Sequence, residues 1–379
     1  MVRPAQLPAA IEGLLRDGLD RPELAVRAVH APRPVRADDI EGVLPLDVRI
    51  VEAPGAPERV LAVVLKARRG AGIGETLLPE WLERAGVRLD RPLSEHPTAA
   101  EWLRADAREI DAYRRFSGLE ATRGFLPAFY GASESPDEDE YLLAIERVDG
   151  AILMDSGDDV SGWHPPMRWR IIEALAQLHA VGLGEPSDPR WPEHVADAAS
   201  AVADAPLLRE LLEAGRRALP RVVTPEVYAL ASGLVDTIDA WYPPKDALPR
   251  TLVHNDCNPR NACFRADRTA LVYDWELALW DTPQRDLAEL LAFSLEPGFE
   301  QVALLEPIER HRRALGRAAG VELDADAWRE GLRIQMRYQL VNRVAWQWLF
   351  AAAMRDEARP GAAYVPRITA VTAQILRRL

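Results

Sequence analysis

The stretch that decides the fold is VHNDCNPRN, residues 253–261, which is followed closely by LVYDWE, residues 271–276. The first stretch gathers a histidine, an aspartate and asparagines in one short loop, and the second is an apolar run that leads into an aspartate. Asp256 and Asn261 are five residues apart, and Asp274 lies 18 residues after Asp256. An Asx-rich turn between a helix and a hairpin would use the same residue types, so the loop alone leaves both interpretations open.

The oxygen-bearing side chains of the two segments suit a magnesium ion and a proton acceptor. Mg²⁺ prefers carboxylate oxygens, carbonyl oxygens and water, and it usually also binds substrate phosphates. A second aspartate that the metal does not need can orient a hydroxyl group and accept its proton. Kinases build their catalytic centre from an H-x-D-x-x-x-x-N loop and a following strand that ends in Asp. The pairing of the two motifs therefore favours catalysis over a structural turn.

The composition is that of a folded, acidic protein, whose negative charge would repel phosphate-rich surfaces. Of the 379 residues, 48% are hydrophobic and 28% are charged, and the net charge is -13. A surface this acidic repels nucleic acid and anionic lipid, so neither is an expected partner. No run approaches the roughly 20 apolar residues that span a membrane, and the two cysteines lack clustered histidines for a zinc site. We therefore expect a cytoplasmic protein, and its length favours two packed lobes.

The chain divides into a strand-rich part and a helical part. Strand-like runs occupy residues 24–31, 44–53, 59–68 and 141–148, and the apolar spacing of residues 101–116 predicts a helix between them. Beyond Gly150, helical spacing covers residues 167–182, 205–219, 225–242, 284–295 and 326–354. The sequence thus predicts an α+β protein. It has a small β-rich N-terminal lobe (1–148), with an insertion at about 70–98, and a larger, mainly helical C-terminal lobe (149–379).

The N-terminal part offers a lysine and a glutamate that could complete the site. Lys66 is the one lysine in the apolar run VLAVVLKAR, where it either extends along the surface at a strand end or reaches a phosphate. Glu109 lies in the expected helix AREIDAYRRF and is spaced to face that strand. Each residue alone has an ordinary structural interpretation, as an edge lysine or a solvated helical charge. Together they suit an ion pair.

These residues together resemble the aminoglycoside phosphotransferase and choline kinase family, which has the protein-kinase-like two-lobed fold. The family loop reads roughly H-G-D-x-x-x-x-N, which His254, Asp256, Pro259 and Asn261 match. The segment YDWE matches the family element D-[FW]-E. The resemblance extends over about residues 24–350, and it implies an enzyme that uses ATP and Mg²⁺.

The resemblance also assigns roles to individual residues. It makes Asp256 the catalytic aspartate, Asn261 and Asp274 the Mg²⁺ ligands, and Lys66 a contact to the nucleotide phosphates that Glu109 holds in place. The segment LLAIERVDG resembles the hinge, which implies that backbone groups of Glu146 and Val148 meet the adenine. By the same resemblance His179 is structural and Asp286 braces the site. Supporting or substrate-facing roles fall to His254, Arg260 and Glu276.

Some positions depart from the family pattern. Asn255 stands where the family usually has glycine, and Arg260, which could reach the substrate, precedes the metal-binding asparagine. The phosphate-covering loop is expected in residues 33–45, where Gly42 is the only glycine beside Asp38, Asp39 and Glu41. Acidic residues beside a triphosphate predict weak nucleotide binding or a different loop closure. Two further features are interpreted structurally: GAGIGET (70–76) as a turn, and the aromatic cluster of Tyr338, Trp346 and Trp348 as core.

We therefore expect a phosphotransferase that moves the γ-phosphoryl group of ATP to a hydroxyl of a small molecule. One alternative is a peptide Ser/Thr kinase in a ribosomal-peptide (lanthipeptide-like) modification pathway. In that case the insertion at about 70–98 would dock the peptide or a protein partner. A second alternative is a pseudokinase that binds a partner without catalysing a reaction. The acidic, glycine-poor loop is the observation that suggests it.

Overall fold

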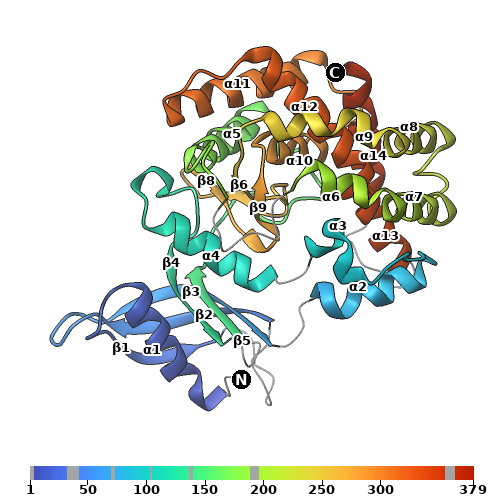
Figure 1. The fold of residues 1–379 in the computed structure, drawn as a ribbon. Helices are drawn as coiled ribbons and strands as arrows, with labels where there is room; N and C mark the ends of the chain where they lie inside the picture. The colour runs from blue at the N-terminus through green and yellow to red at the C-terminus, as the bar shows by residue number, and fades with distance from the viewer. Residues whose placement is uncertain are drawn as a thin grey trace.

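The computed structural model describes residues 4–31, 42–69, 73–102, 105–135, 140–187, 196–354 and 363–379. Within these ranges the chain forms a small lobe built on a β-sheet and a larger lobe built mainly of helices (Figure 1). This is the α+β, protein-kinase-like, two-lobed arrangement that the sequence predicts. Asp38, Asp39, Glu41, Gly70 and Gly72, on which two of the loop interpretations depend, lie outside the described residues.

The small lobe contains a five-stranded antiparallel sheet in the order β1-β2-β3-β5-β4. Its strands are β1 (Ala25–His30), β2 (Gly42–Val51), β3 (Arg59–Arg69), β4 (Phe129–Ser135) and β5 (Glu140–Glu146). Alternate residues of β2 and β3, among them Leu46, Val48, Leu61 and Val63, are buried on one face, as the two-residue period of a strand requires. The four predicted runs are confirmed. Strand β4 was not predicted, because its glycine, serines and glutamate are poor strand formers.

A helix that the sequence analysis did not predict, α1 (Leu7–Gly18), covers the apolar face of this sheet. Its residues Ile11, Leu14 and Leu15 are buried in the same cluster as the inward residues of β2 and β3. The helix approaches β4 so closely that a Cβ atom at Gly131 would lie 2.0 Å from the carbonyl oxygen of Leu14. Glycine is therefore required at position 131, where φ is also +141°.

Helix α4 (Ala105–Ser117) connects the sheet to the segment Trp275–Leu277 of the large lobe. It is the helix predicted for residues 101–116, and it begins at Ala105. Its buried residues Ile110, Tyr113 and Phe116 belong to the main core, and Phe116 packs against Trp275 with ring centroids 4.9 Å apart. This packing fixes the helix between the lobes and turns Glu109, one turn before Tyr113, toward β3.

The large lobe surrounds two short strand pairs with helices. The first pair joins β6 (Thr251–Val253) to β9 (Leu279–Asp281), and the second joins β7 (Ala262–Phe264) to β8 (Ala270–Val272). Its main helices are α5 (Pro165–Ala180), α6 (Ala198–Ala203), α7 (Ala205–Ala218), α8 (Pro225–Asp236), α9 (Ile238–Trp241), α10 (Gln284–Ser294), α11 (Gln301–Ala319), α12 (Ala325–Gln339), α13 (Ala345–Ala353) and α14 (Val365–Arg378). Helices α6, α11 and α14 were not predicted. None of the described helices combines the length and the hydrophobicity of a membrane span.

The long helix predicted for residues 326–354 is interrupted. A π-helical turn, Leu340–Val344, separates α12 from α13, although the apolar spacing runs through it without a break. Such turns occur frequently at functional sites, because they re-aim side chains out of the helical register. The aromatic residues predicted as core, Tyr338, Trp346 and Trp348, are all buried around this turn.

The insertion packs on the large lobe, although the sequence analysis assigned it to the N-terminal part. Helices α2 (Ile73–Arg84) and α3 (Pro97–Ala100) lie beside α7 and α13, apart from the sheet (Figure 1). Leu78 and Leu82 are buried in the same cluster as the apolar residues of α7, and Trp81 contacts Phe350 with ring centroids 5.1 Å apart. The contact therefore buries the apolar side of α2 within the chain itself.

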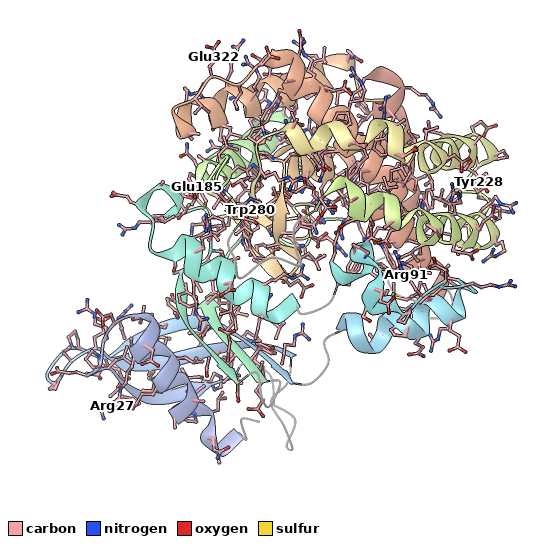
Figure 2. All side chains as sticks on the ribbon, in the orientation of Figure 1. Arg27, Arg91, Glu185, Tyr228, Trp280 and Glu322 are labelled. Carbon is pink, nitrogen blue, oxygen red and sulfur yellow. The ribbon has the colours of Figure 1, made fainter. Side chains whose placement is uncertain are left out.

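The second half of the insertion is held by one buried carboxylate. Asp204 is fully buried and accepts hydrogen bonds from the Arg91 guanidinium (2.6 Å) and from the backbone N–H (2.6 Å) and hydroxyl (2.7 Å) of Thr98. Arg91 lies where the insertion meets the helical lobe (Figure 2). A carboxylate with this many donors is costly to uncover, so the insertion is anchored at this end.

Candidate active site

A cavity with a volume of about 340 Å³ lies where the sheet meets the large lobe. The strands supply apolar walls through Val43, Val64 and Ile145, and the segments that follow β5 and β8 supply Val148 and Glu276. Lys66, Tyr273 and Asp274 line its inner end, and Glu146, Met154, Arg68, Arg147 and Pro127 complete it. The cavity thus has an apolar part and a charged end, which is the form of a site for a flat ring that carries phosphates.

The charged end is organised by Lys66. Its ammonium group donates to both carboxylate oxygens of Glu109 (2.7 and 2.8 Å) and to Oδ1 of Asp274 (2.5 Å). Burial by itself would lower the pKa of Lys66, but the charges of Glu109, Asp274 and Glu276 outweigh it and raise that pKa well above its ordinary value. The structure thus joins Lys66 and Glu109, 43 residues apart, as the helix spacing predicted.

The loop that follows β6 is held by a buried aspartate at the start of α10. Asp286 accepts hydrogen bonds from the backbone N–H groups of His254 and Asn255 (2.7 Å each) and pairs with Nε2 of His179 (2.9 Å). Asn255 has a φ of +62°, a left-handed conformation that asparagine tolerates better than most residues. This explains how Asn255 replaces the glycine that the family usually has there.

The carboxylate of Asp256 is surrounded by donors. Its Oδ2 accepts from the side-chain amide of Asn261 (2.6 Å), and its Oδ1 accepts from Asn258 (3.0 Å) and from Arg343 (2.5 Å). The amide nitrogen of Asn261 is thereby engaged, so its amide oxygen is the atom that would ligate a metal. The arrangement orients Asp256 and Asn261 with respect to each other.

Asp274 is positioned by the contact between the loop and the β7–β8 hairpin. The backbone N–H of Tyr273 donates to the carbonyl of Asn261 (3.0 Å), its hydroxyl donates to the carbonyl of Arg260 (2.6 Å), and the His254 ring contacts its carbonyl (2.8 Å). The backbone of Asp274 itself adopts the left-handed conformation, with a φ of +68°. Burial would raise the pKa of Asp274, but Lys66, His254 and Arg260 lower it on balance, so the carboxylate is ionised.

The sequence profile of the family described as Phosphotransferase enzyme family matches residues 93–332, which is more than half of the chain. The chain belongs to this family. It is therefore an enzyme, a kinase that transfers a phosphoryl group to a hydroxyl acceptor. No curated protein matches the chain in sequence.

Solved structures resemble this phosphotransferase at low sequence identity. A choline/ethanolamine kinase family protein from Mesorhizobium loti is 16% identical with a TM-score of 0.49, and the match covers 92% of this chain and 91% of that one. Choline kinase LicA from Streptococcus pneumoniae is 13% identical with a TM-score of 0.45, covering 92% and 94%. The GDP complex of aminoglycoside 2'-phosphotransferase-IIIa is 14% identical with a TM-score of 0.47, covering 97% and 99%.

The segment that resembles a hinge adds one detail to the expectation. Glu146 and Val148, whose backbone groups were predicted to meet the adenine, both line the cavity. However, the backbone N–H of Glu146 donates to the carbonyl of Ala128 (2.8 Å), so this group is engaged within the sheet region. The Glu146 carboxylate pairs with Arg265 (2.5 and 2.6 Å). An adenine contact at Glu146 would therefore use its carbonyl oxygen.

Two residues of the site were missed by the sequence analysis. Arg343 comes from the π-helical turn and pairs with Asp256, while Glu289 of α10 lies 3.8 Å from Arg343 Nε and accepts a hydrogen bond from Asn258 (3.3 Å). Burial, followed by the charge of Asp256, raises the pKa of Glu289 to about 6. The available signal for Arg343 was a single charge inside the apolar run LVNRVAWQW, the same signal that identified Lys66.

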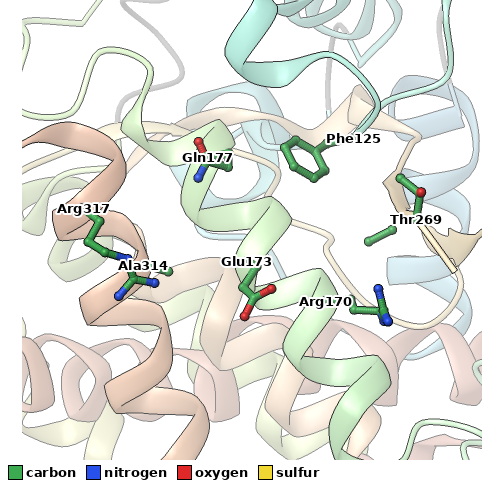
Figure 3. A pocket seen from close by; sticks show the side chains of 8 residues that line it. Phe125, Arg170, Glu173, Gln177, Thr269, Ala314 and Arg317 are labelled. Carbon is green, nitrogen blue, oxygen red and sulfur yellow. The ribbon is translucent and has the colours of Figure 1, made fainter.

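A second cavity, with a volume of about 500 Å³, lies elsewhere on the large lobe (Figure 3). It is lined by residues of α5, α11 and the β7–β8 hairpin, together with Phe125: Arg170, Glu173, Gln177, Thr269, Ala270, Ala314 and Arg317. None of the predicted site residues lines it. Its size alone therefore does not make it the active site.

The two residues predicted to hold a metal, Asn261 and Asp274, would suit magnesium better than zinc. In the part of the chain that the structure describes, no group of three or more His, Cys, Asp and Glu side chains could hold a metal ion. Asp274 and Asn261 offer one carboxylate and one amide oxygen. Mg²⁺ is usually bound by one or two such ligands together with waters and substrate phosphates, so this pair suits a metal that arrives with a nucleotide.

Replacing Asp286 by asparagine should lower the free energy of unfolding by about 3 kcal/mol, because the amide nitrogen would face a backbone donor in a buried place. The hydrogen bonds of Asp286 from His179 and His254 outweigh its burial and lower its pKa. Its contribution is therefore present above about pH 4 and lost as the pH falls further. Urea unfolding at pH 7 and pH 3 measures this. The exposed Asp236→Asn is the control, and equal stability of Asp286→Asn and wild type at pH 7 would contradict the bracing role.

Glu276 should make stability depend on pH. Burial, followed by the charge of Asp274, raises its pKa to about 8, above the roughly 4.3 of an unfolded chain. The folded state therefore holds this proton more tightly, and the residue contributes less stability as the pH rises from about 4 to about 8. We expect the melting temperature of Glu276→Gln, relative to wild type, to increase from pH 5 to pH 8. A constant difference would refute this, and Glu58→Gln, at an exposed position, serves as control.

Proposed function

We propose that this phosphotransferase transfers the γ-phosphoryl group of ATP to a hydroxyl of a small-molecule acceptor with the help of Mg²⁺. Two contacts carry the proposal. Lys66 and Asp274 are joined at 2.5 Å at one end of the cavity between the lobes. Asn261, which is bonded to Asp256 at 2.6 Å, accepts at its carbonyl from the backbone N–H of Tyr273, the residue before Asp274. These residues come from β3, from the loop after β6 and from the segment after β8. These contacts link a donor, a metal-binding pair and a proton acceptor.

Lys66 orients the nucleotide phosphates in this proposal, and Glu109 holds Lys66. Asn261 and Asp274 would hold Mg²⁺, which when bound neutralises the charge of the phosphates. Lys66 now donates to Asp274 at 2.5 Å. Its ammonium group is thus within reach of the place where a phosphate between the lysine and the metal ligands would lie.

Asp256 positions the acceptor hydroxyl and receives its proton. The donors Asn258, Asn261 and Arg343 hold its carboxylate in a fixed orientation. This is sufficient for phosphoryl transfer, in which the protein contributes mainly positioning and electrostatic stabilisation. Glu276 and Glu289, whose pKa values are raised, are secondary carboxyl groups beside this path.

The intact ion pair between Lys66 and Glu109 supports catalysis rather than the pseudokinase alternative. The insertion buries Leu78 and Leu82 against α7 and α13, so these two residues need no protein partner to be covered. A small-molecule acceptor is therefore preferred over a docked peptide. Use of ATP also suits the cytoplasmic location that we propose.

The test is a transfer assay with radiolabelled ATP and a panel of acceptors. The panel should contain choline, aminoglycosides, simple sugars and a Ser/Thr-containing peptide library, each with Mg²⁺ and with EDTA. We expect labelling of at least one small molecule, dependent on Mg²⁺ and lost in Asp256→Asn. Labelling confined to peptides would support the peptide kinase instead. Failure of the protein to bind ATP with Mg²⁺ would refute the proposal.

A further inference from the structure

Arg260 is a charged residue of the catalytic loop that the proposed function has not yet used. It directly precedes Asn261, and its guanidinium group lies over the ring of Tyr364, 5.3 Å from the centroid. Its Nη2 is 3.8 Å from Oδ2 of Asp256, and a third of the side chain (33%) is exposed. The side chain is thus buried along its stem and open at one side.

The neighbouring segment is shaped to receive the stem of Arg260. A Cβ atom at Gly157 would lie 2.6 Å from Cγ of Arg260, so no other residue fits at this position without displacing the arginine. Ser156 binds the loop at the preceding residue, through its backbone N–H to the carbonyl of Pro259 (3.0 Å). On the other side, the Tyr273 hydroxyl holds the carbonyl of Arg260 (2.6 Å). The side chain is therefore held in one direction.

The guanidinium group lacks a close anionic partner within the described residues. Its separation of 3.8 Å from Asp256 exceeds a hydrogen bond, the Tyr364 hydroxyl is 3.5 Å away, and Nε has no hydrogen-bond partner there. Other arginines of the site have a close carboxylate: Arg343 lies 2.5 Å from Asp256, and Arg265 pairs with Glu146. A held arginine without a matching anion is suited to a ligand with several oxygens, because its planar fork fits phosphate.

The position of Arg260 indicates which phosphate of the nucleotide it would contact. Its Nη2 lies 3.8 Å from Oδ2 of Asp256, the proposed proton acceptor, and the residue directly precedes Asn261, a proposed metal ligand. The phosphoryl group must pass between these two residues, since the acceptor oxygen lies at the first and the nucleotide phosphates lie at the second. The α- and β-phosphates belong to the Lys66 end of the cavity. A guanidinium group beside the proposed proton acceptor would therefore meet the γ-phosphate rather than the α- and β-phosphates.

We propose that Arg260 binds the γ-phosphoryl group of ATP and stabilises its charge during transfer. This rests on the proposed function. In the reaction, a bond forms between the γ-phosphorus and the acceptor oxygen, and the bond to the β,γ-bridging oxygen breaks. ADP leaves with that electron pair, and the hydroxyl proton passes to Asp256. Arg260 forms no covalent bond, and its charge offsets the negative charge of the equatorial oxygens.

Nucleotide binding to Arg260→Met tests the proposal without knowledge of the acceptor. Calorimetry with Mg²⁺ compares a non-hydrolysable ATP analogue, the imido analogue, with ADP. We expect Arg260→Met to weaken binding of the analogue about 10- to 100-fold, the effect of losing one charged contact, and to change ADP binding less than about twofold. Arg260→Lys keeps the charge without the fork and should lie between. Arg209→Met, which removes an exposed ion pair with Asp236, is the control.

The outcomes separate this inference from the proposed function. Wild-type protein that binds both nucleotides, with an unchanged preference for the ATP analogue in both Arg260 variants, would overturn the role of Arg260 alone. Equal weakening of ADP and the analogue would also overturn it, because it would show a general effect on the loop. Wild-type protein that binds neither nucleotide would overturn the proposed function and this inference together. If Arg260→Met unfolds, as its melting curve would show, Arg260→Lys decides alone.

Discussion

Asp256→Asn should reduce the rate of phosphoryl transfer by about 10²- to 10⁴-fold, the usual contribution of a positioned proton acceptor. Asparagine keeps the size of the side chain but cannot receive the hydroxyl proton. Its amide nitrogen would also face the donors that now surround the carboxylate, those of Asn261 (2.6 Å) and Arg343 (2.5 Å). The acceptor hydroxyl would therefore lose both its base and its orientation.

Binding of the nucleotide should survive in this variant, because Lys66, Glu109 and Asp274 remain in place. Single-turnover transfer to the acceptor found in the panel measures the rate, and calorimetry with Mg²⁺-ATP measures the affinity, which should change less than about threefold. Asp267→Asn, at an exposed position of the β7–β8 hairpin, is the matched control. A turnover close to that of wild type would exclude Asp256 as the proton acceptor.

Asp274→Ala should remove the stabilisation of the protein by Mg²⁺-ATP. A ligand present at about 100 times its dissociation constant adds about 2.7 kcal/mol to the free energy of unfolding, which raises the melting temperature by several degrees. The variant loses the one carboxylate proposed for the metal, so the phosphates lose the contact that Mg²⁺ would provide. Lys66 keeps Glu109 as its partner. We expect a melting shift in wild type and almost none in Asp274→Ala.

Thermal unfolding with and without Mg²⁺-ATP measures this shift. Asp267→Ala should shift as wild type does, since its side chain is exposed near the hairpin end and far from the metal ligands in the hairpin register. ATP without Mg²⁺ separates the metal from the nucleotide. A full shift in Asp274→Ala would show that the metal is held elsewhere, and the assignment of Asn261 would then also need revision.

Much of the site could be predicted from short stretches of sequence. His254, Asp256 and Asn261 share one loop, and Asp274 ends the next apolar run. Their spacing in the sequence was therefore sufficient to predict that they lie close together. Lys66 was recognisable because a lysine inside an apolar strand has few structural uses. Its partner Glu109 followed from the helical period, and the structure places them 2.7 Å apart.

The residues that escaped prediction depend on contacts between distant parts of the chain. Arg343 reaches Asp256 across 87 positions of sequence, through a π-helical turn that the apolar pattern of residues 326–354 does not reveal. Helix α1 and strand β4 stabilise each other through the close approach at Gly131. Neither has a strong pattern by itself. The placement of α2 on α7 and α13, rather than on the sheet, depends on the shape of a surface formed by other segments.

The sequence by itself determined which residues are proposed for the chemistry of this phosphotransferase, because carboxylates, an asparagine and a lysine in an apolar strand are recognisable by residue type and local spacing. It also determined the division into a strand-rich and a helical part, since the two hydrophobic periods differ. Only the tertiary structure decided which charges surround Asp256, where the insertion packs, and that Arg260 is held 3.8 Å from Asp256. These depend on distances between segments far apart in the chain, and such distances are fixed by packing of the whole core.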